Sequence, residues 1–222
     1  MVTVPSKEEL IKLVLKRLKA RYHAQMRTSL DHGDPWQLLV ATILSAQSQD
    51  MQVNKVTGKL FKEFKSVASF AEAKPKELYP YIKTLGLYRS KAKHVVEAAK
   101  VLASRFDSSV PHTIEELTEM PGVGRKTANV VLSNAFGINE GIAIDTHCTT
   151  VSNRLGIVNS RDPRKIESAV MKITPTAEWG NISLLFIALG RDVCTARVKY
   201  CARCVLNDIC PSSDAGRKGL VK

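Results

Sequence analysis

Four cysteines near the C-terminal end of this 222-residue chain have a spacing typical of a metal site. They are Cys194, Cys201, Cys204 and Cys210, in the pattern C-x6-C-x2-C-x5-C. In a chain without a secretory signal, such a group indicates metal ligands before disulfide bonds. Zinc sites usually combine two closely spaced cysteine pairs, and here only Cys201 and Cys204 form one, so the spacing favours an iron–sulfur cluster over zinc. Cys148 stands apart and is expected to be a small buried apolar residue.

A glycine-rich turn that leads into a helix is a second candidate site. Gly122 and Gly124 flank the small apolar Val123. The glycines allow backbone N–H groups to point outward at a helix N-terminus, where the helix dipole favours anions. Arg125 and Lys126 add positive charge beside the turn, which could therefore hold a phosphate. The alternative is an ordinary turn between two packed helices.

Lys126 and Asp145 could also act chemically. Positive potential at the start of a helix disfavours the ammonium form of Lys126, and a neutral amine can form a Schiff base with a carbonyl carbon. Asp145 ends the apolar run 142–144, which places its carboxylate near the edge of a core, where it could move protons or stabilise a developing cation. In the simpler alternative, Lys126 contacts phosphate and Asp145 only caps a helix. We interpret His147 as a hydrogen-bonding residue at that helix start or as a phosphate contact.

Helical patterns dominate the chain and must position these residues. Apolar residues recur every three to four positions, and strand-like alternation is essentially absent. Capping signals stand at Ser6 with Glu9, at Thr113 with Glu116, at Asp50, and at the Asp-Pro pairs 34–35 and 162–163, while Gly137 and Gly156 stand where helix-ending glycines belong. We predict an all-α fold with helices from Ser6, over 36–46, from Asp50, from Ser90, and over 114–119, 125–136, 146–155, 163–173 and 178–190.

Composition and charge limit the possible classes of protein. Lys plus Arg number 33 and Asp plus Glu 21, so the formal net charge is +12, and 44% of the residues are apolar. Such a chain should fold into one large or two small domains, and its charge indicates a polyanionic partner, nucleic acid first. No apolar run reaches the roughly 18–20 residues of a membrane span, and the first residues do not read as a signal peptide. We therefore expect a cytoplasmic protein without membrane contact.

The order of the glycine turn, the aspartate and the cysteines resembles the endonuclease III family. These proteins are bifunctional DNA glycosylases and abasic-site lyases of the helix-hairpin-helix superfamily. The resemblance covers nearly the whole chain and includes the segments 38–47, 85–88, 121–131 and 144–147. It implies two all-α domains with a DNA cleft between them. Residues 28–139 would form a six-helix barrel with the helix-hairpin-helix at about 113–137, and residues 1–27 plus 140–222 would form an iron–sulfur cluster domain.

The resemblance also implies roles for individual residues. Lys126 matches the Schiff-base lysine and Asp145 the essential carboxylate, and the four clustered cysteines match the ligands of a [4Fe–4S] cluster. Gln47 matches the residue that fills the space left by an extruded base, and Leu87 the wedge pushed into the base stack. The DNA contacts expected in this way are Gln47, Leu87, Gly122, Val123, Gly124, Arg125, His147, Arg197 and Lys199.

The activity implied is base excision repair of damaged, above all oxidised, pyrimidines. Lysine Schiff-base chemistry would release the base, and β-elimination would cut the strand 3′ to the site. The partner would be double-stranded DNA with a damaged base or an abasic site, bound by a monomer associated with a prokaryotic nucleoid. One alternative is a mismatch, uracil, thymine, adenine or oxidised-purine glycosylase of the same superfamily. Another is a non-catalytic DNA-binding iron–sulfur protein, against which the presence of both Lys126 and Asp145 argues.

Overall fold

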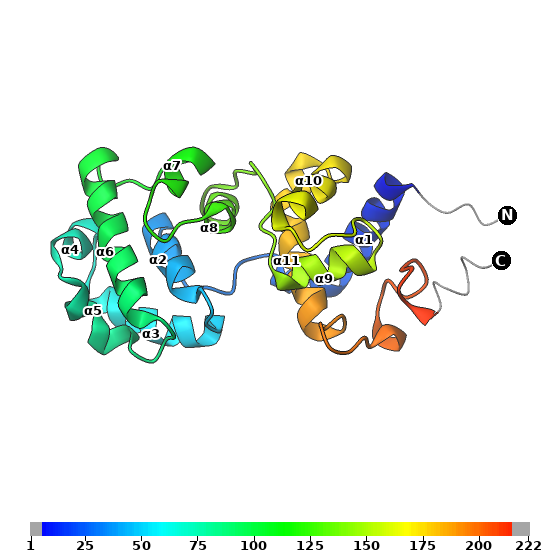
Figure 1. Ribbon diagram of the computed structural model, residues 1–222, viewed down its shortest axis with the longest axis horizontal. Coiled ribbons are helices and arrows are strands. Elements are labelled where there is room, and N and C mark those ends of the chain that lie inside the picture. Colours follow the sequence, from blue (N-terminus) through cyan, green and yellow to red (C-terminus); the bar gives the residue numbers. More distant parts are fainter. Residues whose placement is uncertain (1–5, 215–222) are drawn as a thin grey trace. The chain divides into compact units, whose positions relative to one another are not determined.

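The computed structural model describes residues 6–214, which fold almost entirely into helices (Figure 1). Within this range no β-strand is present, and one isolated antiparallel bridge joins Cys194 to Lys199. The predicted all-α fold is therefore confirmed. None of the helices between residues 6 and 214 combines the length and apolar character that a membrane span requires. Residues 1–5, which contributed to the expectation that no signal peptide is present, lie outside the described residues.

The backbone contacts divide the chain into two units, Thr28–Glu140 and Met1–Arg27 together with Gly141–Lys222. The first unit contains α2 (Pro35–Ser45), α3 (Asp50–Glu63), α4 (Val67–Glu72), α5 (Pro75–Ile82), α6 (Tyr88–Arg105), α7 (Ile114–Thr118), α8 (Arg125–Val131) and the π-helical turn η2 (Leu132–Phe136). The second contains α1 (Lys7–Tyr22), η1 (His23–Gln25), α9 (Thr146–Arg154), α10 (Pro163–Ile173), η3 (Thr176–Glu178), α11 (Trp179–Asp192) and η4 (Cys201–Arg203).

Helix α2 is the central element of the unit 28–140. Asp34 caps it by accepting a hydrogen bond from the Gln37 N–H at 2.8 Å, and Pro35 occupies its first turn. All residues from Leu38 to Leu44 are buried, so the helix is apolar on nearly every side. It packs against α3, α6, α8 and η2 (Figure 1). The positions of the turns at the ends of these helices therefore depend on the burial of α2.

In the other unit, helix α1 packs against α10 and α11, and α9 packs against the same two helices. The predicted capping box at the start of α1 is confirmed, because Ser6 and Glu9 exchange side-chain to backbone hydrogen bonds of 3.1 and 2.8 Å. Ile11 and Leu18 of α1 are completely buried in the same core as Phe186 of α11. The N-terminal helix is thus part of the core that the C-terminal half forms.

One predicted helix cap is wrong. The N-cap residue of α3 is Gln49, which makes no side-chain cap, and the Asp50 carboxylate accepts a hydrogen bond from Ser29 Oγ at 2.6 Å. Helix α6 begins at Tyr88, two residues before the predicted start, and its N-cap residue Leu87 has a left-handed conformation with φ 57°. The helix predicted over 125–136 has these bounds but changes to π-helical geometry after Val131.

Other local differences are smaller. Thr113 caps α7, but the Glu116 carboxylate accepts from the Thr113 hydroxyl at 2.8 Å, so the full capping box predicted there is absent. Helices α4 and α5 were not predicted, because each has two turns or fewer and Pro80 lies inside α5. The predicted helix-ending glycines are confirmed, with φ 68° at Gly137 and 71° at Gly156. The remaining boundaries lie within two residues of those predicted.

Candidate functional site

The turn between α7 and α8 places one glycine on each side of a buried anchor. Val123 is buried, and its N–H donates to the Met120 carbonyl at 3.1 Å. Gly122 and Gly124 are exposed, and Gly124 is the N-cap residue of α8. Lys126 is exposed in the first turn of that helix. The first N–H groups of a helix have no partner within it, so this end of α8 can bind an anion beside the amine of Lys126.

The two glycines are required for different reasons. Gly122 has φ +80°, and a Cβ atom at this position would lie only 2.8 Å from the Cβ and Nδ1 atoms of His94 on α6. Gly124 has φ −97°, and nothing lies within 4 Å of the place where its Cβ would stand. The contact of His94 with this turn could not be predicted from local sequence patterns, because His94 lies 28 residues earlier along the chain. Only the packing of α6 against the turn identifies it.

The segment that leads to Asp145 is held by two neighbouring helices. The Ile142 N–H donates to the buried Glu167 carboxylate of α10 at 3.1 Å. The Ala143 carbonyl accepts from the Ser183 hydroxyl of α11 at 2.7 Å. Asp145 then caps α9, with its Oδ1 atom accepting from the Cys148 N–H at 2.8 Å. The predicted cap is confirmed, and it fixes a half-buried carboxylate at the edge of this core.

Of the residues that follow Asp145, His147 is half-buried and Cys148 lies inside the same core. The His147 side chain packs on the backbone of α11 at Gly190, where a Cβ atom would lie 2.8 Å from the His147 Cβ. Cys148 is completely buried, as predicted, and burial raises the pKa of its thiol to about 12, with the Asp145 carboxylate contributing in the same direction. Cys148 is therefore an unreactive thiol at neutral pH. Lys126 belongs to the unit 28–140 and Asp145 to the other unit, so their predicted meeting stays a prediction.

Gln47 and Leu87 lie in two turns that the structure brings together. Both are exposed, Leu87 to 61%, and both have left-handed backbones with φ 54° and 57°. A Cβ atom at Gly86 would stand 4.0 Å from the Gln47 carbonyl oxygen. The Gln52 side chain also donates to the Thr84 hydroxyl at 2.8 Å, which ties the start of α3 to the second turn. The residues predicted as filler and wedge are thus neighbours.

The four clustered cysteines line one small cavity. Arg154, Lys199 and Asn207 contribute to the same lining. Burial raises the pKa of the Cys204 and Cys210 thiols, and the other cysteines raise it further, because neighbouring thiolates would repel one another. Among the described residues, no group of three or more His, Cys, Asp or Glu side chains is arranged to hold a metal ion. The cysteines therefore share a cavity without being grouped around a single ion.

Arg154 of α9 shapes the loop that follows the first of these cysteines. Its Nη1 atom donates to Cys194 Sγ at 3.3 Å and to the Thr195 carbonyl at 2.7 Å, and Nη2 donates to the Ala196 carbonyl at 3.1 Å. Arg197, predicted to contact DNA, is exposed in this loop. The Lys199 ammonium, also predicted as a DNA contact, donates to the Ser212 carbonyl at 2.7 Å.

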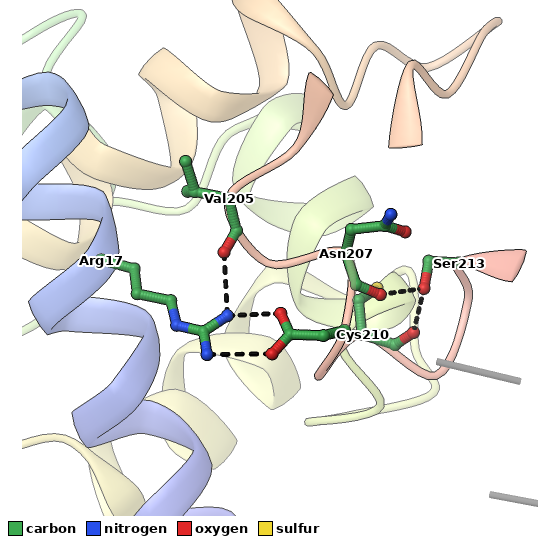
Figure 2. A network of polar contacts seen from close by, with 6 residues as sticks. Arg17, Val205, Asn207, Cys210 and Ser213 are labelled. Atoms are coloured by element: carbon green, nitrogen blue, oxygen red, sulfur yellow. Dashed lines mark hydrogen bonds and ion pairs between the residues drawn. The ribbon is translucent and has the colours of Figure 1, made fainter. Parts of the chain in front are cut away.

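A second arginine holds the segment between Cys204 and Cys210. The Arg17 guanidinium of α1 donates to the Val205 carbonyl at 3.0 Å (Figure 2). The same guanidinium forms a two-pronged ion pair with the Asp208 carboxylate. This pairing lowers the pKa of the Asp208 carboxyl. Ser213 donates to the Cys210 carbonyl at 2.9 Å and also to the Asn207 carbonyl (Figure 2). Residues outside the cysteine pattern thus order the loops that carry the cysteines.

Comparisons with known proteins agree with this arrangement. The family model for HhH-GPD superfamily base excision DNA repair proteins matches residues 40–176. The endonuclease III of Synechocystis sp. is 44% identical over 92% of each chain, and that of Thermotoga maritima is 37% identical over 97% of each. A solved endonuclease III, trapped as a covalent intermediate with DNA in an estranged-adenine complex, is 36% identical, with a TM-score of 0.86 over 99% of this chain and 100% of that one.

The two glycines of the turn before α8 allow a matched test. Gly122→Ala should destabilise the protein by about 2–5 kcal/mol, because a left-handed alanine costs roughly 1–2 kcal/mol and overpacking against His94 roughly 1–3 kcal/mol. Gly124→Ala should change the free energy of unfolding by less than about 1 kcal/mol, since its φ suits alanine and the space beside it is open. Urea unfolding of both variants measures the difference. Equal stability of the two variants would contradict the steric role of His94.

Proposed function

The chain belongs to the HhH-GPD superfamily of base excision DNA repair proteins, in its endonuclease III family, and on this premise we propose that it is a bifunctional DNA glycosylase and abasic-site lyase. We propose damaged, above all oxidised, pyrimidines in double-stranded DNA as its substrates. The observation that carries the proposal is the exposed amine of Lys126, in the first turn of α8 and beside a turn suited to phosphate. This arrangement places a nucleophile next to groups that can bind the DNA backbone.

The proposed grip on DNA uses backbone groups and fixed charge. The N–H groups at the start of α8 would bind phosphate oxygens, and Arg125 would add a cation beside them. The net charge of +12 would supply the attraction that is independent of sequence. Contacts to phosphate hold the duplex in register without reading its bases, which suits a protein that must inspect many sites.

A base inside a duplex hides its glycosidic bond, so the nucleotide must leave the stack before reaction. Extrusion costs a few kcal/mol, and less where the base is damaged or mispaired. We propose that Leu87 enters the stack as a wedge and that Gln47 fills the space left behind. Both side chains are exposed on adjoining turns, so they can reach the duplex together.

The proposed reaction begins when the Lys126 Nζ lone pair attacks C1′ of the extruded nucleotide. The bond from C1′ to the base breaks, and the base leaves with that electron pair and takes up a proton. The sugar ring opens to an imine between Nζ and C1′, which acidifies the C2′ proton. Loss of this proton expels the 3′ phosphate and cuts the strand, and water then hydrolyses the imine to free Lys126.

Asp145 would serve this reaction as a carboxylate of fixed position. Its backbone is held by the neighbouring helices through Ile142 and Ala143, and its Oδ1 atom is held by the cap of α9. From there it would accept a proton from the Lys126 ammonium and stabilise the positive charge that develops on the sugar as the base leaves.

We propose that the four cysteines around the shared cavity are the ligands of a [4Fe–4S] cluster. The donor set fits this group, because a four-iron cluster is larger than a single ion and takes one thiolate at each iron. Positive metal charge would overcome the burial that keeps the thiols of Cys204 and Cys210 protonated. When bound, the cluster would supply rigid links between the loop 195–200 and the segment 205–210.

The role of Lys126 predicts covalent trapping. Borohydride should reduce the imine and leave the protein attached to duplex DNA with an abasic site, and Lys126→Gln should abolish this product because an amide is no nucleophile. Lys100→Gln, a change of an exposed lysine on α6, is the matched control and should trap as the wild type does. Denaturing gel electrophoresis measures the product. Trapping by Lys126→Gln would exclude this lysine as the nucleophile.

The role of Asp145 can be separated from its cap. Asparagine is as good a helix cap as aspartate. The free energy of unfolding of Asp145→Asn should therefore lie within about 1 kcal/mol of the wild-type value. The same variant should lose about 100-fold or more in single-turnover base release, because the charge is gone. Asp145→Ala should lose activity and, in addition, about 1 kcal/mol of stability. If Asp145→Asn releases the base at the wild-type rate, the carboxylate has no part in the reaction and Asp145 serves only as a helix cap.

The cluster proposal predicts coloured protein. Freshly purified protein should absorb broadly near about 400 nm and contain about four iron and four sulfide ions per chain. Cys204→Ser should lose this absorption, while Cys148→Ala should keep it, since that thiol lies in the core formed around α9. Iron analysis and absorption spectra measure both. Colourless protein with stoichiometric zinc would overturn the assignment.

A further inference from the structure

We propose that Lys91 is a positioning residue that holds the turn of Gln47 and the turn of Leu87 together as one base-extruding element. The proposal rests on the function proposed above and adds a residue that has no part in the covalent chemistry. Lys91 lies on α6, one helical turn after Leu87.

Lys91 makes contact with both turns through different atoms. Its backbone N–H donates to the Leu87 carbonyl at 3.0 Å, which is the first hydrogen bond of the α6 ladder. Its ammonium group donates to the Ser48 hydroxyl at 2.8 Å, and Ser48 directly follows Gln47. Lys91 therefore links the Leu87 carbonyl to Ser48, the residue that follows Gln47.

The burial of Lys91 is unusual for a lysine. Only 3% of Lys91 is exposed, although lysine is almost never fully buried unless it is paired with an opposite charge. The partner that the described structure gives its ammonium is a neutral hydroxyl. Burial also lowers the pKa of Lys91, because the charged ammonium is less favourable away from water.

The two turns need such support because both are strained. Gln47 and Leu87 hold left-handed backbones that non-glycine residues rarely adopt. Strained residues persist only where the surrounding structure determines them fully, and they gather at functional sites. Here the link from Lys91 to Ser48 and the bond between Gln52 and Thr84 fix the two turns against each other.

The consequence for the reaction depends on the substrate. Extrusion of a paired base requires filler and wedge to enter the duplex at the same place. A nucleotide that has already lost its base has no pairing or stacking of that base to break. Loss of the Lys91 link should therefore slow base release from a paired lesion far more than it slows strand cutting at an abasic site.

The test compares Lys91→Met with Lys93→Met, which changes the neighbouring exposed lysine of α6. Single-turnover base release is measured on a duplex with 5,6-dihydrouracil paired with adenine, and strand cutting on the same duplex with an abasic site. For Lys91→Met we expect about a tenfold or greater fall in base release and less than about a threefold change in cutting. Urea unfolding should show unchanged or higher stability, because an apolar side chain of similar length replaces a buried charge. Lys93→Met should match the wild type in all three measurements.

Partner variants complete the design. Ser48→Ala should reproduce the selective fall in base release, and the double variant should be no slower than Lys91→Met alone, because both changes remove one contact. Equal losses in base release and cutting, or base release by Lys91→Met within threefold of the wild type, would overturn the positioning role. A wild-type protein that fails to trap on abasic DNA would instead overturn the proposed function, so the two failures are distinguishable.

Discussion

The burial of α2 is the constraint on which the unit 28–140 depends. Its residues Leu38 to Leu44 are all buried, and α3, α6, α8 and η2 pack around them. Close packing leaves a buried helix few alternative positions. The helices packed against α2, and the turns at their ends, are therefore also held in place. The turn of Gln47 directly follows α2, and Lys126 lies in the first turn of α8, which packs against α2. A local disturbance of α2 would therefore move both.

Helix starts carry the residues proposed for base extrusion and for the covalent chemistry, apart from Gln47, and there is a physical reason for this. Leu87 is the N-cap residue of α6, Asp145 is the N-cap residue of α9, and Lys126 lies in the first turn of α8. The body of each helix is committed to a core, whereas its first turn presents unpaired N–H groups and a positive dipole end. A DNA repair protein of helices can thus bind phosphate and place carboxylates without any loss of core packing.

The sequence predicted features that depend on neighbours along the chain and missed those that depend on distant ones. The caps at Ser6, Asp34 and Asp145 were correct, because each is a local pattern. The Asp50 cap was wrong, because Ser29 binds that carboxylate from a different part of the chain. The roles of Lys91, His94, Arg154 and Arg17 depend on partners that only the fold brings near.

Stability alone does not account for the residues around the two strained turns. A glycine at position 47 or 87 would relieve the left-handed backbone, and an apolar side chain at position 91 would avoid the burial of a charge. The chain instead has the proposed filler Gln47, the proposed wedge Leu87 and the buried Lys91 within one small region. Gly122 shows the opposite solution, because no side chain has to act there and a glycine removes the strain. At the turns of Gln47 and Leu87 the proposed function needs a side chain in spite of the strain, whereas at Gly122 only the backbone is needed.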